Sequence, residues 1–294
     1  MDRWKALSAS EIRLLDHVFW SSRISRERLA SGSAFSKSRA NAAVAGMLEQ
    51  GVLEASGEQV PTGGRRAETL RLSRGLGVLL SVALGATGLE VGVLAPDLQV
   101  LAHHSEPADV RDGPGIVLSR VRTLMRELLA QAGMRPRDVI AIGIGVPGPV
   151  EFVSGQLGNP PLVPEWDAYS IRDDLHAEYA APVFVDNDVN VMALGELWRL
   201  QRGLPNFLVI KVGTGIGCGI VCHGQVYRGA NGSAGDVGHI CVDPSGPRCH
   251  CGNLGCVETM AAGPAIARAA TEAAQDGRST LLAQMLAGRG GLRL

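Results

Sequence analysis

The chain has 294 residues, of which 46% are hydrophobic, and a formal net charge of −1. This length and apolar content are enough for a buried core and for two domains. The sequence holds no run of about twenty uncharged apolar residues and no basic start followed by an apolar segment. It therefore predicts a soluble cytoplasmic protein rather than a membrane or secreted one.

The charge is uneven along the chain. Residues 1–74 carry 12 Lys and Arg against 8 Asp and Glu, and the remainder carries 16 against 21. A basic end on an acidic protein indicates binding to a polyanion such as DNA.

Within that basic end, apolar residues spaced three and four apart predict three helices. The first is capped by Ser8 or Ser10, the second covers residues 24–30, and the third runs from its cap at Ser36 to Gly51. A helix, a short helix, a turn and a helix follow one another in the helix-turn-helix motif.

Residues 52–72 predict two strands joined by a turn at residues 61–64, which is the wing of a winged helix-turn-helix. Side chains suited to phosphates and base edges lie on the third helix and at the wing tip: Ser36, Lys37, Ser38, Arg39, Asn41, Arg65 and Arg66. We therefore expect residues 1–74 to bind operator DNA. The alternative is a helical protein-interaction module with a solvated basic face.

The rest of the chain alternates strand and helix patterns. The predicted elements are a hairpin over 79–94, a helix over 115–132 that buries Ile116, a strand over 139–146, a strand over 182–185 leading into a helix over 189–200, and a second hairpin over 208–222. Both hairpins turn on Gly-rich segments. This repetition predicts a duplicated α/β architecture.

Three cysteines and a histidine have the composition of a metal site. Three sulfurs and one imidazole suit a closed, four-coordinate structural zinc ion, and they are Cys249, Cys251, Cys256 and His239. His250 is the alternative fourth ligand. The other thiols are predicted to be buried and inert: Cys218, Cys222 and Cys241. All six cysteines lie between residues 218 and 256, which disfavours a secreted disulfide framework.

Asn187 and Asp188 follow a predicted strand, at the position where α/β folds place ligand groups. Short amide and carboxylate side chains suit sugar hydroxyls. As an alternative, the pair caps the helix that follows. The turn Gly213-Thr214-Gly215 is likewise open to two interpretations, phosphate binding and a tight hairpin turn.

Taken in order, these motifs resemble the ROK family of repressors and sugar kinases. The matching segments are the winged helix-turn-helix, GIGVPGPV at 143–150, Asn187-Asp188, Gly213-Thr214-Gly215, GDVGH at 235–239 and the Cys-rich run at 249–258. The resemblance implies an actin-like, ribonuclease-H-like duplicated α/β fold over residues 75–294, with a sugar between its halves. By matching positions it implies sugar contacts from Asn187, Asp188, Asp236, His239 and Glu258, beside a structural zinc ion.

Three departures separate the chain from the kinases that it resembles. The first Gly-rich turn keeps Gly85 and Thr87 but has Ala83 where the kinases have an acid, which removes a metal contact. Asp236 stands where the family usually has the longer Glu. The chain ends about 38 residues beyond Cys256, which predicts a fragment or a truncated second half.

We therefore expect a sugar-responsive, DNA-binding transcriptional regulator. It would repress carbohydrate-utilisation genes as a homodimer on two half-sites, with a sugar or sugar phosphate as effector. The alternative is an ATP-dependent sugar kinase with an accessory DNA-binding domain. In that case Asp188 would be the general base, and Gly213, Thr214 and Gly215 would hold phosphate.

Overall fold

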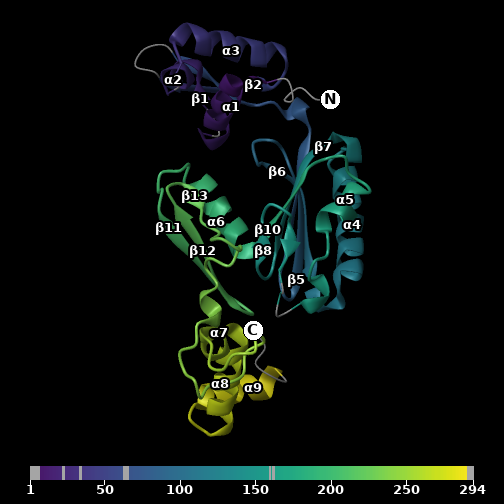
Figure 1. Ribbon diagram of the computed structural model, residues 1–294, viewed down its shortest axis with the longest axis vertical. Coiled ribbons are helices and arrows are strands. Elements are labelled where there is room, and N and C mark those ends of the chain that lie inside the picture. The colour runs from purple at the N-terminus through teal and green to yellow at the C-terminus, as the bar shows by residue number, and fades with distance from the viewer. Residues whose placement is uncertain are drawn as a thin grey trace.

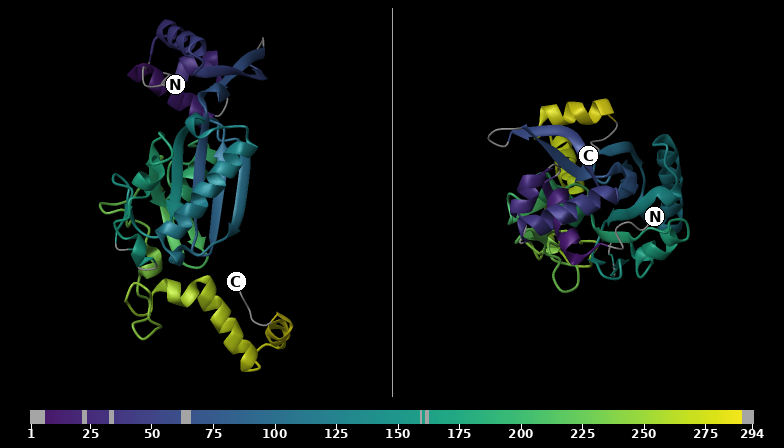
Figure 2. Two further views of the ribbon diagram at one scale, coloured as in Figure 1. Left: turned by 90° about the vertical axis from the view of Figure 1, so that its right-hand side faces the viewer. Right: turned by 90° about the horizontal axis from the view of Figure 1, so that it is seen from above.

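The computed structural model describes residues 7–21, 24–32, 35–61, 66–158, 160 and 163–289. These residues form three tiers along the longest axis of the molecule (Figures 1 and 2). N-terminal helices and a small sheet lie at one end, two larger units lie side by side in the middle, and the C-terminal helices lie at the other end. None of the helices in these ranges is long and apolar enough to cross a membrane.

The described part of residues 7–72, termed here the N-terminal module, contains three helices and a three-stranded sheet. The elements are α1 (Ala9–Ser21), β1 (Ile24–Ser25), α2 (Arg26–Gly32), α3 (Lys37–Glu49), β2 (Leu53–Pro61) and β3 (Arg66–Leu72), with strand order β1-β3-β2. The predicted caps are present, since Ser8 and Glu11 bond each other's backbone N–H groups and Ser36 Oγ accepts from the N–H of Arg39. The core side chains include Leu14, Val18, Leu29, Val44, Met47 and Leu70.

The second helix starts later than its periodicity predicts. Ile24 and Ser25 form β1, which pairs antiparallel with Leu70 and Thr69 of β3, so α2 begins only at Arg26. Pairing with a distant strand overrides the local helical pattern.

The first lobe (residues 78–187) is built on one five-stranded sheet. Its strands are β4 (Val78–Leu84), β5 (Gly88–Leu94), β6 (Val100–Pro107), β7 (Val139–Val146) and β10 (Val183–Asn187), in the order β10-β7-β4-β5-β6. The pairs β4–β7 and β7–β10 are parallel, and β4–β5 and β5–β6 are antiparallel. Helices α4 (Pro114–Gln131) and α5 (Ile171–His176) pack on the sheet, and the short strands β8 (Val150–Glu151) and β9 (Gln156–Leu157) follow β7.

The prediction that Ile116 of α4 is buried is wrong. Ile116 is 67% exposed, because the buried stripe of α4 runs through Val117, Val121, Leu124 and Leu128 at helical spacing. Ile116 lies one position before that stripe and is therefore turned toward solvent.

The second lobe (residues 188–289) begins with α6 (Asp188–Arg199), which contacts the sheets of both lobes. Its own sheet has the order β11-β12-β13, from β11 (Phe207–Val212), β12 (Ile216–Cys222) and β13 (Gln225–Val226). The helices α7 (Val257–Ala261), α8 (Gly263–Gln275) and α9 (Thr280–Arg289) follow. Both predicted hairpins, β4–β5 and β11–β12, are confirmed with their Gly-rich turns.

Helix α6 packs against β12 at a distance that only glycine allows. A Cβ atom on Gly219 would lie 2.6 Å from the carbonyl oxygen of Val189 and 2.7 Å from Cβ of Ala193. A Cβ atom on Gly217 would lie 2.9 Å from a methyl carbon of Val189. The helix therefore rests directly on the backbone of the strand.

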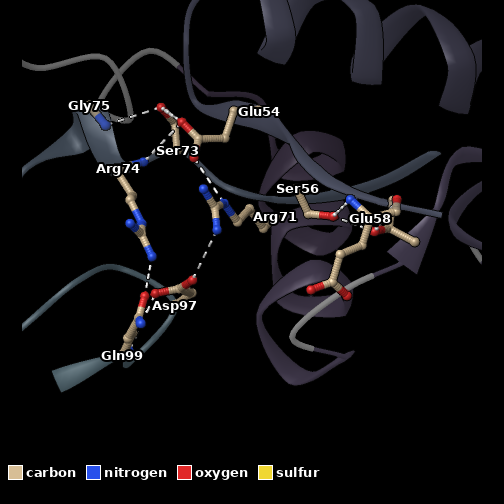
Figure 3. Close-up of polar contacts among 10 residues, drawn as sticks. Glu54, Ser56, Glu58, Arg71, Ser73, Arg74, Gly75, Asp97 and Gln99 are labelled. Carbon is tan, nitrogen blue, oxygen red and sulfur yellow. Dashed lines mark hydrogen bonds and ion pairs between the residues drawn. The ribbon is translucent and has the colours of Figure 1, made fainter.

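The N-terminal module is joined to the first lobe by a polar network beside the connecting segment (Figure 3). Glu54 accepts hydrogen bonds from Arg71 Nε at 2.9 Å, from Ser73 Oγ at 2.9 Å and from the N–H of Arg74 at 3.2 Å. Arg71 lies 4.0 Å from Asp97, and Arg74 bonds Gln99, both in the turn between β5 and β6. We call this network the first-lobe anchor.

The close approach of α6 to β12 generates a prediction about stability. Gly219→Ala is expected to lower the free energy of unfolding by about 1–3 kcal/mol, because the added methyl forces the helix from the strand. Gly195→Ala is the matched control: Gly195 lies in α6, and a Cβ atom added to it would have no neighbouring atom within 4 Å. That change should raise the free energy of unfolding by about 0.5–1 kcal/mol. Urea unfolding of both variants measures the difference, and equal effects would contradict the packing.

Candidate functional site

Asn187 lies where β10 ends and α6 begins. Its Oδ1 accepts hydrogen bonds from the N–H groups of Val189 at 2.9 Å and Asn190 at 3.3 Å, so Asn187 is the N-cap of α6, as the capping interpretation predicts. Its Nδ2 donates to the carbonyl oxygen of Gly148 at 3.0 Å. Asn187 thus ties the start of α6 to the loop after β7.

Asp188, the next residue, is held by a cation that the sequence analysis missed. Its Oδ2 lies 2.5 Å from Nζ of Lys211, and its Oδ1 accepts from the N–H of Val189 at 2.9 Å. Lys211 lies on β11 in line with Phe207 and Val209, which face the core beneath α6. The signal that identifies it is a lysine at a core-facing position of an alternating strand.

Asp186 is a second residue that the sequence analysis left without a role. It is 4% exposed. Its Oδ2 accepts from Nε of Arg228 at 2.9 Å and from Nη2 at 2.6 Å, and its Oδ1 accepts from Nδ2 of Asn190 at 3.0 Å. The Arg228 guanidinium also lies 4.0 Å from the ring centroid of Phe152. This buried, fully bonded pair links the first lobe to the second lobe.

The turn Gly213-Thr214-Gly215 is fixed by contacts to the C-terminal helices. Oε2 of Glu258 accepts from the N–H of Ile216 at 3.0 Å, and the carbonyl oxygen of Gly213 accepts from the N–H of Gly263 at 2.8 Å. A Cβ on Gly215 would lie 2.4 Å from the Glu258 carboxylate. Glu258 therefore braces this turn.

The GDVGH loop lies against the same end of β12. A Cβ on Gly238 would lie 2.2 Å from the carbonyl oxygen of Ile216, and one on Gly235 would lie 1.7 Å from that of Cys218. These two contacts place His239 beside the start of β12. Asp236 is half-exposed, with Oδ1 3.8 Å from Nε2 of His239. The β11–β12 turn thus gathers Asp188, Asp236, His239 and Glu258 around one end of the second sheet.

The ligand atoms of His239, Cys249, Cys251 and Cys256 lie within 4.8 Å of one another. The Sγ atoms of Cys251 and Cys256 are 3.7 Å apart, and Sγ of Cys249 is 3.4 Å from Nδ1 of His239. A tetrahedral zinc site with usual bond lengths has S···S edges of about 3.8 Å and S···N edges of about 3.6 Å. The cluster therefore has the dimensions of a tetrahedral metal site.

Metal binding at the cluster requires its thiols to lose their protons. Burial raises the pKa of the Cys256 thiol to about 12, and burial also raises the pKa of Cys249. A cysteine that binds a metal does so as a thiolate. A bound cation would stabilise the negative charge that burial disfavours on these sulfurs. Nδ1 of His239 faces the sulfurs, so Nε2 remains for a partner on the side of Asp236.

The remaining histidine and cysteine expectations have mixed outcomes. His250 is exposed and does not belong to the cluster, whose fourth member is His239. Cys218 is buried as expected, but Cys222 and Cys241 are exposed. Cys222 is the last residue of β12, and Cys241 forms an isolated bridge with Cys256 in the loop after His239, so both lie at the surface.

The first Gly-rich turn lies in the first lobe, where it joins β4 to β5. Ala83 is exposed near the end of β4. The N–H of Gly85 donates to the carbonyl oxygen of Gly88 at 2.8 Å, and the carbonyl oxygen of Thr87 accepts from the N–H of Ala108 at 3.3 Å. In this turn the backbone groups therefore close the hairpin and hold the chain after β6.

The described residues expected to bind DNA lie at the N-terminal end of α3. Ser36, Lys37, Ser38, Arg39 and Asn41 are exposed, whereas Ala40 between them is buried. Arg39 lies over the Phe35 ring at 5.4 Å and donates to Oγ of Ser10 at 3.3 Å. Arg65 lies outside the described residues, and Arg66 begins β3 with its side chain outside them.

The cluster generates a prediction about bound metal. Freshly purified, reduced protein is expected to carry about one equivalent of a metal ion, because four preformed ligands surround one point. Cys251→Ser should reduce the bound metal to less than about half an equivalent. His250→Ala, which removes an exposed imidazole next to the cluster, should leave it unchanged. Elemental analysis decides, and an unaltered protein with less than about half an equivalent would contradict the site.

Comparison with known proteins places this arrangement in a wider group. Residues 79–285 match the profile of the ROK family. Glucokinase of Halalkalibacterium halodurans is 35% identical over 206 residues, covering 69% of this chain and 62% of its own length. The DNA-binding transcriptional dual regulator NagC of Escherichia coli K12 is 28% identical over 260 residues, covering 88% of this chain and 63% of its own.

A solved structure described as a ROK family transcriptional regulator, homologous to the E. coli MLC protein, is similar over 91% of this chain and 69% of its own. The TM-score is 0.70 at 26% identity. The chain spans less than two thirds of the length of both curated relatives. The family includes repressors as well as glucokinases, and the matched region contains both lobes with the cluster of His239, Cys249, Cys251 and Cys256. The chain therefore belongs to the ROK family.

Proposed function

We propose that the chain is a sugar-responsive transcriptional regulator that represses carbohydrate-utilisation genes. The observation that carries this proposal is the N-terminal module in front of the ROK region. The match to the E. coli regulator runs over 260 residues, more than the chain has left from residue 79 onward, so it reaches into the module. The glucokinase match, over 206 residues, is no longer than the ROK region itself.

The module is proposed to be a winged helix-turn-helix, with residues 1–74 as the DNA-binding domain and residues 75–294 as the sugar-sensing domain of an actin-like duplicated fold. Helix α3 would enter the major groove, because its exposed surface carries Lys37, Arg39 and Asn41. The β2–β3 hairpin would be the wing, with Arg65 and Arg66 near phosphates. A homodimer would read two half-sites.

The effector is proposed to be a sugar or sugar phosphate at the end of β11–β12. Asn187, Asp188, Asp236, His239 and Glu258 would contact its hydroxyls, with a zinc ion holding the loop that carries His239. In this proposal the Lys211 ammonium, which has three donor groups and one bonded oxygen among the described contacts, also faces the ligand. Binding would shift the balance between DNA-competent and DNA-incompetent states.

DNA binding is tested first by selecting duplexes from a randomised pool and measuring affinity against salt. Arg39→Ala is expected to weaken binding and to reduce the slope of log affinity against log salt by roughly one, because one phosphate contact is lost. Arg278→Ala is the matched control, since it removes the same charge from an exposed position between α8 and α9. No selected duplex, or identical slopes for both variants, would contradict the DNA-binding proposal.

A sugar kinase is the second candidate, because Asp188 and the Gly213-Thr214-Gly215 turn are retained. Two observations favour binding without turnover. Ala83 offers no oxygen to a metal ion, and the Asp188 oxygen that would take the hydroxyl proton is held by Lys211.

Sugar-dependent ADP release separates the two candidates. With ATP, Mg²⁺ and glucose, xylose or N-acetylglucosamine, the protein should release no more ADP than Asp188→Ala does. A sugar that binds should raise the melting temperature in the same panel by mass action. Turnover clearly above that of Asp188→Ala would overturn the regulator in favour of the kinase.

A further inference from the structure

The N-terminal module is held by both lobes, at two separate places. The first-lobe anchor joins β2 and β3 to the turn between β5 and β6. The second contact lies on α1, whose Trp20 packs against a core of α6, β12 and β13 that consists of Ala193, Leu197, Val221 and Val226. A rigid module attached to two lobes responds to any change in their relative position.

The second contact is a closed triangle of three side chains, which we call the Trp20 latch. The guanidinium carbon of Arg202 lies 4.0 Å from the Trp20 ring centroid, and Nη1 of Arg202 lies 3.5 Å from Oδ2 of Asp16. Nε1 of Trp20 donates to Oδ1 of Asp16 at 2.9 Å. Each member of the latch therefore contacts the other two, and only Arg202 comes from the second lobe.

Arg202 is fixed to the C-terminal end of α6 by its backbone. Gln201 and Arg202 have φ values of 48° and 57°, the left-handed region that non-glycine residues rarely occupy. The N–H of Arg202 donates to the carbonyl oxygen of Leu197 at 3.1 Å. The left-handed backbone directs the Arg202 side chain toward α1. There the cation–π contact and the ion pair offset the energy cost of the left-handed conformation.

The opposite end of α6 carries the candidate sugar site. Asn187 caps it, and Asp188 lies in its first turn beside Lys211. At Gly217 and Gly219 the helix α6 rests directly on the β12 backbone, so the helix and its sheet are closely packed along their length. The 12-residue helix thus joins the site to the latch across about 18 Å.

We propose that the Trp20 latch couples the relative position of the two lobes to the position of the N-terminal module. The first-lobe anchor is the firmer attachment, since the chain itself passes beside it from β3 to β4 of the first lobe. The latch has an ion pair whose side chains are 42% and 53% exposed, so it yields first when the lobes move. Its use in transmitting a sugar signal to DNA rests on the proposed function, but the mechanical coupling does not.

Hydrogen exchange followed by mass spectrometry tests the coupling without sugar or DNA, on the full chain. Arg202→Ala is expected to raise amide exchange in α1 and in residues 200–207. It should also raise exchange by about fivefold in peptides covering residues 186–191 and 226–235, which lie at the contact between the lobes. Arg199→Ala is the matched control, because Arg199 lies on the last turn of α6 and pairs with Glu196 of the same helix.

Exchange that rises only in α1 and residues 200–207 would overturn the proposal, since the latch would then be local packing. Equal effects of Arg199→Ala and Arg202→Ala would overturn it as well. Asp16→Asn provides a second variant with nearly unchanged shape, and it should reproduce the distant effect at smaller size if Arg202→Ala fails to fold. If the unaltered protein binds neither DNA nor a sugar, the proposed function is contradicted. The hydrogen-exchange evidence for the coupling would still stand.

Discussion

The contact between α6 and β12 sets how the start of α6 meets the second sheet. Gly217 and Gly219 remove the side chains that would separate the helix from the strand, so the two backbones meet directly. Lys211, which pairs with Gly217 across the β11–β12 hairpin, is thereby brought against Asp188. The strand β12 also contacts the loop that carries His239, through Ile216 and Cys218. The close approach of α6 to β12 thus brings together side chains from the start of α6 and from β11.

The three residues at the front of α6 are chemically similar, yet the fold gives each a different task. Asp186 is buried in an ion pair with Arg228 from the other lobe, Asn187 caps the helix, and Asp188 is paired with Lys211. The Lys211 ammonium lies near the N-terminus of α6, where the helix dipole is unfavourable to a positive charge. The negative charge of Asp188 offsets this repulsion. The Asp188 carboxylate therefore already has a charged partner before any ligand binds.

The segment from residue 240 to 256 has little apolar core of its own. Ile240, Val242 and Leu254 are about half exposed. Its order comes instead from backbone packing, such as Gly255 against the carbonyl oxygen of Asp243, and from the cluster of His239, Cys249, Cys251 and Cys256. A metal crosslink substitutes for hydrophobic burial in such short segments. A metal ion held by this cluster would also fix His239, so that the order of the loop and the geometry of the candidate site would depend on the same four residues.

The sequence by itself determined the local features: the helical and strand periodicities, the caps at Ser8 and Ser36, both Gly-turn hairpins and the four-ligand cluster. These follow from interactions between residues close in the chain or from residue types with few alternative uses. Tertiary structure alone decided the start of α2, since Ile24 and Ser25 pair with a strand more than forty residues away. It also decided the partners of Asp186 and Asp188 and the Trp20 latch, because Arg228, Lys211 and Arg202 lie far from those residues in the chain and meet them only in the folded protein.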